Sequence, residues 1–96
     1  MSTKFRDFLN EQLKDPEFRA EYEALELEET ISQAVIDARE SAGLTRKQLA
    51  EKSGLAQSDI SKLENGNRNP SLNMLKKLAA GLDMSLKIEF VPRAQA

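Results

Sequence analysis

The feature that most constrains this chain is a pair of short helices, separated by a three-residue turn, within residues 45–66. Thr45 is a typical helix N-cap, and Gln48 three residues later completes a capping box. The turn that follows is centred on Gly54, the residue type that adopts a positive φ without penalty. A second helix is predicted over residues 57–64.

The apolar residues of this segment predict how the two helices pack. Ala50 must be small because the second helix crosses closely over it. Ile60 and Leu63 must point back into the core, where Leu49 and Leu55 assist them. Two short helices with this spacing and a glycine turn form the helix-turn-helix pattern.

Helical spacing extends through the N-terminal part of the chain. Apolar residues predict a helix over residues 3–13. Asp15 as N-cap and Pro16 as first helical residue predict the start of another. Three glutamates within residues 26–29 indicate either a break or a solvated stretch of one helix. The sequence leaves open whether residues 16–42 form one helix or two.

Beyond the central pair, Ser71 is predicted to cap a further helix that Gly81 closes. The apolar face of this helix is expected to consist of Leu72, Leu75, Leu78 and Ala79.

Residues 85–91 alternate between apolar and charged side chains, which predicts a β-strand stopped by Pro92. The sequence has no second strand candidate, and the backbone groups of a single strand are unpaired. We expect symmetric pairing in a homodimer; the alternatives are pairing with a partner protein or a tail packed on its own domain. The side chains expected to face inward in the paired strand are Leu86, Ile88 and Phe90.

The amino-acid composition excludes most kinds of catalytic and metal-binding site. The chain has no Cys and no His, so thiolate zinc sites, thiol nucleophiles and the commonest general base are absent. Glu28 and Glu29 are adjacent, so on a helix they diverge. We therefore expect no enzyme, no metal and no cofactor. No apolar run approaches the roughly 20 residues that span a bilayer. The charged start MSTKFRDF does not resemble a secretory signal, which predicts a soluble, cytoplasmic protein without membrane partners.

The net charge of −2 conceals a division of the chain. Residues 1–40 carry five basic and eleven acidic side chains, whereas residues 41–96 carry nine basic and five acidic ones. Such asymmetry predicts two different surfaces. The basic half is suited to a polyanion, and the acidic half to something else or to solvent alone.

Residues 32–84 resemble the Cro/phage-repressor (Xre-type) family. The resemblance rests on GLTRKQLAEKSGLAQSDISKLENGNRNPSLNMLKKLA, within which the glycine turn, the I-S-K-L-E-N-G exit and the N-P-S-L start of the following helix are specific. It implies an all-α fold: a five-helix helix-turn-helix domain with an N-terminal helical extension and one C-terminal strand. The expected divisions are an extension (1–30), a DNA-binding domain (31–84), a strand (85–91) and a tail (92–96).

The resemblance also implies how DNA is bound, with the second helix of the pair in the major groove. Gln57 could read adenine and Lys62 guanine, whereas Asp59 does not suit a DNA surface. Arg46 resembles the family's phosphate contact. The full set of expected DNA contacts is Arg46, Gln57, Ser58, Ser61, Lys62, Asn65, Asn67 and Arg68. Arg39 and Glu64 occupy the positions of a structural ion pair in the family and are not expected to contact DNA.

The N-terminal extension is similar to that of HigA-type antitoxins of type II toxin–antitoxin systems. The resemblance lies in D-P-E-F-R-A-E-Y-E-A-L ahead of the domain and L-K-I-E-F after it. It implies a small, basic, RelE/HigB-like mRNA-cleaving toxin as partner, and repression of the shared operon at a pseudo-palindromic operator. The expected anchors for the toxin are the aromatic residues Phe5, Phe8, Phe18 and Tyr22.

Two other functions remain open from the sequence. One is a stand-alone Xre-family repressor whose N-terminal helices complete its core or its dimer interface. The other is a protein-interaction module that has lost DNA binding, which the acidic pI and Asp59 favour.

Overall fold

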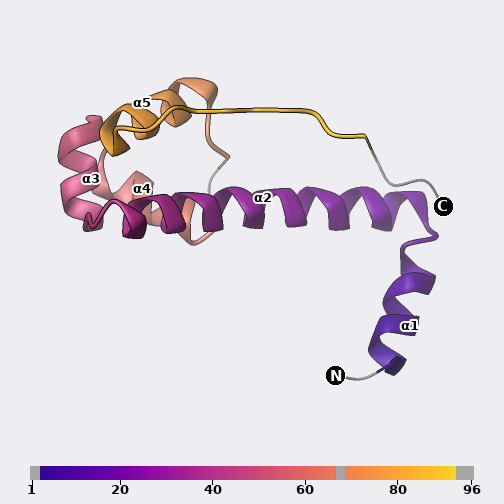
Figure 1. Cartoon of the computed structure of the whole chain (residues 1–96). Helices are drawn as coiled ribbons and strands as arrows, with labels where there is room; N and C mark the ends of the chain where they lie inside the picture. Colours follow the sequence, from indigo (N-terminus) through magenta and orange to yellow (C-terminus); the bar gives the residue numbers. More distant parts are fainter. Residues whose placement is uncertain (1–2, 67–68, 93–96) are drawn as a thin grey trace.

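A computed structural model of the chain describes residues 3–66 and 69–92. The described part is all-α, which confirms the predicted class (Figure 1). It contains five helices in all, which are α1 (Thr3–Gln12), α2 (Pro16–Ser41), α3 (Arg46–Ser53), α4 (Gln57–Glu64) and α5 (Leu72–Leu82). Of these, α1 belongs to the N-terminal extension, so the expectation of five helices in the domain beside that extension is wrong. No described helix is long and apolar enough to cross a membrane.

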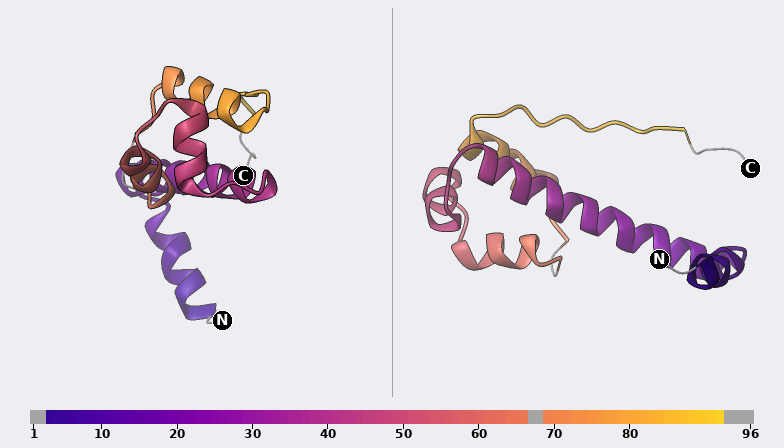
Figure 2. Two further views of the ribbon diagram at one scale, coloured as in Figure 1. Left: turned by 90° about the vertical axis from the view of Figure 1, so that its left-hand side faces the viewer. Right: turned by 60° about the horizontal axis from the view of Figure 1, so that its bottom comes forward.

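The helices divide into a compact group and a projecting arm. α3 packs against α4 and α5, and α4 packs against the C-terminal part of α2. The N-terminal part of α2 extends away from this group, and α1 turns off sharply at its far end (Figures 1 and 2). The resulting molecule measures 46 × 27 × 21 Å along its principal axes. We call α1 and the projecting part of α2, residues 3–30, the arm.

α2 is a single helix of 26 residues, which resolves the alternative that the sequence left open. The glutamates between residues 26 and 29 do not break it, because glutamate is a good helix former and their charges lie largely in solvent. Neither glycine nor proline interrupts the helix after Pro16. The hydroxyl group of Thr30 donates a hydrogen bond to the carbonyl oxygen of Glu26 within the same helix (2.9 Å).

The predicted caps are confirmed. The side chain of Asp15 accepts a hydrogen bond from the backbone N–H of Glu17. Thr45 and Gln48 form the full capping box at the start of α3. Gly54 ends α3 with φ at 78°, in the left-handed region that favours glycine. Ser71 accepts from the backbone N–H of Met74 and caps α5.

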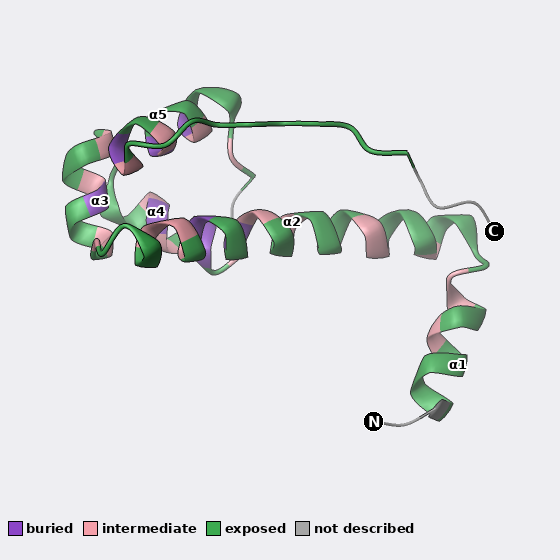
Figure 3. Cartoon of the chain, in the orientation of Figure 1, coloured by how far each residue is buried: buried purple, intermediate pink, exposed green. Residues whose placement is uncertain are grey.

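The hydrophobic core lies between α3, α4, α5 and the C-terminal part of α2 (Figure 3). Leu72, expected on the inward face of α5, is 59% exposed, which corrects that expectation. Its position in the first turn carries it past the end of the core, and Met74 is buried instead. The buried apolar residues are Val35, Leu49, Ile60, Leu63, Met74 and Leu78.

Gly81 does not close α5 as expected; the helix runs to Leu82, and Asp83 caps it with φ at 58°. Gly81 instead allows α5 to cross α3 closely. A Cβ atom at this position would lie 2.9 Å from Cβ of Ser53 and 3.0 Å from its backbone atoms. Glycine is therefore required here by contact distance.

The predicted strand is absent from the described part of the chain. Residues 85–91 are extended but form no strand (Figure 1). The physical reason is that a strand needs a neighbour to supply backbone hydrogen bonds, and no other described segment is extended beside it. The segment follows the direction of α2 toward the arm in both views (Figures 1 and 2).

Candidate nucleic-acid interface

α4 has one face in the core and one in solvent. Ile60 and Leu63 are buried completely or nearly so, and they anchor the helix. Gln57, Ser58 and Lys62, three of the expected base contacts, are exposed. Ser61, also expected at the DNA, is half-buried. α4 therefore presents Gln57, Ser58 and Lys62 to solvent while its apolar side chains hold it against the domain.

A buried serine holds the C-terminal end of α4 against α2. The hydroxyl group of Ser32 donates to the backbone carbonyl of Leu63 at 2.7 Å and also lies 3.1 Å from the carbonyl oxygen of Glu28. Only 6% of Ser32 is exposed. It adds a side-chain hydrogen bond to a carbonyl at the end of α4 that also accepts the backbone N–H of Gly66 at 3.1 Å. Sequence analysis missed this residue, because a serine among polar residues of a helix carries no signal of a contact 31 positions away.

Arg39, Glu64 and Arg46 form one charge cluster. Arg39 donates from Nε to Oε2 of Glu64 (2.7 Å) and from Nη2 to Oε1 (3.1 Å). Its Nη1 donates to the carbonyl of Leu44 at 3.0 Å. Nε of Arg46 donates to Oε1 of Glu64 at 2.9 Å. The sequence predicted the contact of Arg39 with Glu64 but not the third member.

The cluster lies partly inside the protein. The side chain of Glu64 is fully buried, that of Arg39 is 14% exposed and that of Arg46 is 42% exposed. Burial alone raises the pKa of the Glu64 carboxyl. The hydrogen bonds from Arg39 and then Arg46 outweigh burial and hold that pKa below its usual value. Glu64 is therefore charged at neutral pH. It fixes the end of α4 to the end of α2 through Arg39 and to the start of α3 through Arg46.

The remaining expected DNA contacts lie near the end of α4. Asn65 is exposed and forms the C-cap of α4. Asn67 and Arg68 lie outside the described residues. Asp59 is half-buried and has an interaction partner within the structure.

The aromatic residues of the arm fall into two groups. Phe5 and Phe8 of α1 are 59% and 61% exposed, respectively. Phe18 and Tyr22 of α2 are half-buried and stack with ring centroids 6.3 Å apart. The structure therefore does not bring the four rings together in the core of the helix-turn-helix domain.

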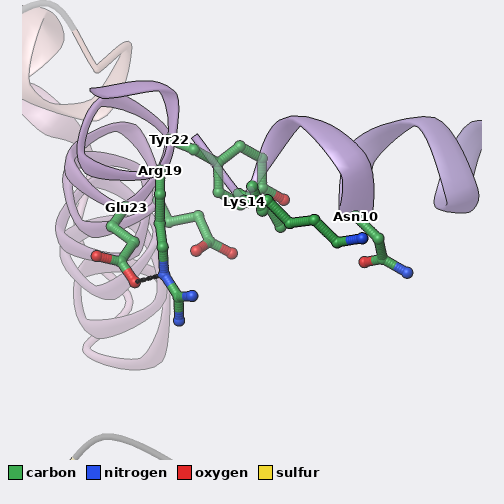
Figure 4. A pocket seen from close by; sticks show the side chains of 7 residues that line it. Asn10, Lys14, Arg19, Tyr22 and Glu23 are labelled. Atoms are coloured by element: carbon green, nitrogen blue, oxygen red, sulfur yellow. Dashed lines mark hydrogen bonds and ion pairs between the residues drawn. The ribbon is translucent and has the colours of Figure 1, made fainter. Parts of the chain in front are cut away.

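The elbow between α1 and α2 encloses an open hollow of about 540 Å³ (Figure 4). Tyr22 lies beside it, and Arg19 pairs with Glu23 at 3.3 Å on the same helix. The lining mixes charged, polar and apolar side chains, and no described group of three or more acidic side chains is placed to hold a metal ion.

The residues expected to face inward in the strand are all exposed in this single chain. They are Leu86, Ile88 and Phe90, of which Phe90 is almost fully exposed. They leave an apolar row uncovered along residues 85–91.

A short exposed helix, held from behind by a second helix across a glycine turn, defines the class of helix-turn-helix proteins. The chain belongs to the helix-turn-helix family of Xre/Cro-like domains, whose model matches residues 35–88. This is a family of DNA-binding regulators and not of enzymes, which confirms that the chain is not an enzyme.

Curated relatives match the same region. An uncharacterized helix-turn-helix-type transcriptional regulator of Sinorhizobium fredii is 38% identical over 58 residues, which cover 60% of this chain. One from Haemophilus influenzae is 41% identical over 54 residues, which cover 56% of this chain. The matches span 30% and 55% of these relatives, respectively.

Solved structures of restriction-modification controller proteins are similar in fold and sequence. C.AhdI from Aeromonas hydrophila is 36% identical, with a TM-score of 0.59, over 60% of this chain and 88% of its own. Wild-type C.Esp1396I is 32% identical, with a TM-score of 0.60, over 62% of this chain and 77% of its own.

Proposed function

We propose that this protein is a transcriptional regulator that binds operator DNA by placing α4 in the major groove. The observation that carries the proposal is the division of α4 into a buried apolar face and an exposed polar face. The major groove of B-DNA admits an α-helix. The basic balance of residues 41–96 supports binding to a polyanion, because phosphates attract cations.

The exposed side chains of α4 and its neighbours have distinct roles in this proposal. The amide of Gln57 suits adenine N6 and N7, and Lys62 suits guanine O6 and N7. Ser58 and Ser61 contact bases or phosphates at the edge of the groove. Arg46 and the segment after α4, Asn65, Asn67 and Arg68, contact the sugar-phosphate backbone.

The Gln57→Ala substitution tests base reading. We expect it to weaken binding to the promoter of the protein's own gene by about 1–3 kcal/mol, because the amide's paired hydrogen bonds to a base are lost. Binding to a duplex of mixed sequence should hardly change. Fluorescence anisotropy with both duplexes measures this. The matched control is Gln33→Ala on α2, where the amide donates to Asp37 at 2.8 Å. Equal losses for the two variants contradict the assignment.

The functional unit in this proposal is a homodimer. Residues 85–91 present an apolar row and are in no strand pairing with other described residues, and two such segments can satisfy each other by antiparallel pairing. Two recognition helices related by a twofold axis would read half-sites about 34 Å apart on a pseudo-palindromic operator.

The dimer is tested by comparing Ile88→Gln with Glu89→Gln. Ile88 is exposed in the single chain, so neither change should affect the fold. We expect Ile88→Gln to weaken dimerisation at least about tenfold, because two apolar side chains leave the interface, and Glu89→Gln to have little effect. Light scattering across a dilution series reports the dissociation constant. A wild-type chain that remains monomeric at every concentration rules the dimer out.

A second candidate function is the DNA-binding antitoxin. The favouring observation is that the arm projects from the domain with Phe5 and Phe8 exposed, so it does not complete the core. Its acidic side chains suit a basic partner by charge complementarity. In this proposal, residues 1–30 bind a small basic RelE/HigB-like toxin while residues 31–84 bind DNA. The regulators found among the relatives support the stand-alone function more directly.

The antitoxin function is tested with the small protein encoded beside this gene. We expect a Phe5→Ala/Phe8→Ala double variant to lose co-purification with that protein and to stop protecting cells from it, because both exposed anchors are removed. Leu72→Ala, which removes an equally exposed apolar side chain from α5, is the control. Unchanged protection by the double variant contradicts the assignment of Phe5 and Phe8 as toxin-binding residues. If the protein encoded beside this gene is neither basic nor toxic, the proposed antitoxin function is wrong.

A further inference from the structure

The charge cluster at the end of α4 contains more positive than negative groups. Two guanidinium groups, from Arg39 and Arg46, contact the single carboxylate of Glu64. The cluster therefore has a formal net charge of +1. Because Glu64 is buried and Arg46 is 42% exposed, the surplus charge lies at the surface on Arg46.

The two arginines use their nitrogen atoms differently. Arg39 engages all three nitrogens, two with Glu64 and one with the carbonyl of Leu44, so it is committed to the fold. Arg46 engages only Nε, again with Glu64. The structure gives its two terminal nitrogens no hydrogen-bond partner among the described residues. Arg46 thus combines an anchored inner edge with an outer edge that can donate to a ligand.

Arg46 lies where the start of α3 meets the end of the proposed recognition helix. Arg46 is the first residue of α3, and Glu64 is the last residue of α4, the proposed recognition helix. The backbone N–H groups that open α3 add positive potential at the same place. A planar guanidinium held at one edge and open at the other suits a phosphate oxygen.

We propose that Glu64 is a positioning residue for DNA binding, which holds Arg46 so that its terminal nitrogens donate to a backbone phosphate. The inference rests on the proposed DNA-binding function and adds a role to a residue that otherwise only braces the domain. One carboxylate then links the stability of the fold to the affinity for DNA.

The first test removes the charge of Arg46. We expect Arg46→Gln to weaken binding about tenfold for each protomer bound, with the slope of log K against log salt reduced by about one unit. Lys52→Gln, at the other end of α3, removes the same charge and should change much less. The probe is a labelled duplex of about 30 base pairs, long enough for two half-sites, from upstream of the gene. An Arg46→Gln variant that binds as wild type overturns the proposal.

The second test uses the direction in which the Glu64→Gln substitution changes the affinity for DNA, because a positioning role and a purely electrostatic role of Glu64 predict opposite directions. Glu64→Gln removes a negative charge, so electrostatics alone predicts tighter binding. Positioning predicts weaker binding in the wild-type background, and unchanged or tighter binding in the Arg46→Gln background. Measurements are made at a temperature where circular dichroism shows each variant folded. Weakening of equal size in both backgrounds, or tighter binding in both, overturns the role of Glu64.

Arg46→Lys keeps the inference testable if the Glu64→Gln variant does not fold. Lysine retains the charge but lacks the planar guanidinium group, whose separate N–H donors can contact the Glu64 carboxylate and a phosphate at the same time. We expect it to retain most of the salt dependence and to bind several-fold more weakly than wild type. Binding equal to wild type shows that a bare cation suffices and overturns the proposal. A wild-type protein that binds no duplex at all overturns the DNA-binding function itself.

Discussion

We expect the Glu64→Gln substitution to lower the free energy of unfolding by about 3–5 kcal/mol at neutral pH, because it breaks a buried ion pair and leaves Arg39 without its carboxylate partner. The side chain of Glu64 is fully buried and that of Arg39 is 14% exposed, so solvent cannot replace the lost contacts. Urea unfolding followed by circular dichroism measures the change. Glu51→Gln, an exposed glutamate on α3, is the control and should change stability by less than about 0.5 kcal/mol.

The effect of Glu64 depends on pH in a defined direction. The folded state lowers the pKa of this carboxyl, so its contribution to stability is fully present above the unfolded pKa of about 4.3. The contribution is lost as the pH falls through the still lower pKa of the folded state. The difference between wild type and Glu64→Gln should therefore shrink below about pH 4. A difference that stays constant down to pH 2 contradicts the lowered pKa.

Ile60→Ala is expected to lower the free energy of unfolding by about 2–5 kcal/mol. Ile60 is fully buried in the core behind α4, and the substitution leaves a cavity that short helices cannot fill by a simple shift. Thermal and urea unfolding both report it. A domain of this size has little stability to spare, so part of the population should be unfolded at 37 °C.

Leu72→Ala is the matched control for that cavity. It also removes an aliphatic side chain from a short helix, but Leu72 is 59% exposed, so its loss should change stability by less than about 0.5 kcal/mol. If the two variants unfold at the same urea concentration, the burial described for Ile60 does not exist in solution.

Features set by neighbouring residues were predictable from the sequence. The capping box of Thr45 and Gln48 and the positive φ of Gly54 depend on interactions over a few positions. The bounds of α4 followed from the same kind of signal. The buried positions of Ile60 and Leu63 followed from helical periodicity and the glycine turn.

Features set by distant residues were not predictable. The contact of Arg46 with Glu64 spans 18 positions, and that of Ser32 with the carbonyl of Leu63 spans 31. Periodicity placed Leu72 on the inward face of α5, but where the core ends depends on the packing of three other helices. The strand over residues 85–91 required a second extended segment beside it, which residues 3–66 and 69–92 do not supply.

The continuity of α2 determines how the arm and the DNA-binding domain are joined. A helix of 26 residues is about 39 Å long and has no flexible joint along its axis. Anything bound to the projecting part of α2 therefore keeps a fixed distance and rotation relative to α4. Each residue added to or removed from the exposed stretch of α2 would turn the arm by about 100° around that axis and displace it by about 1.5 Å. The length of α2 therefore sets the orientation of its projecting end relative to the DNA-binding domain, which a flexible linker would not do.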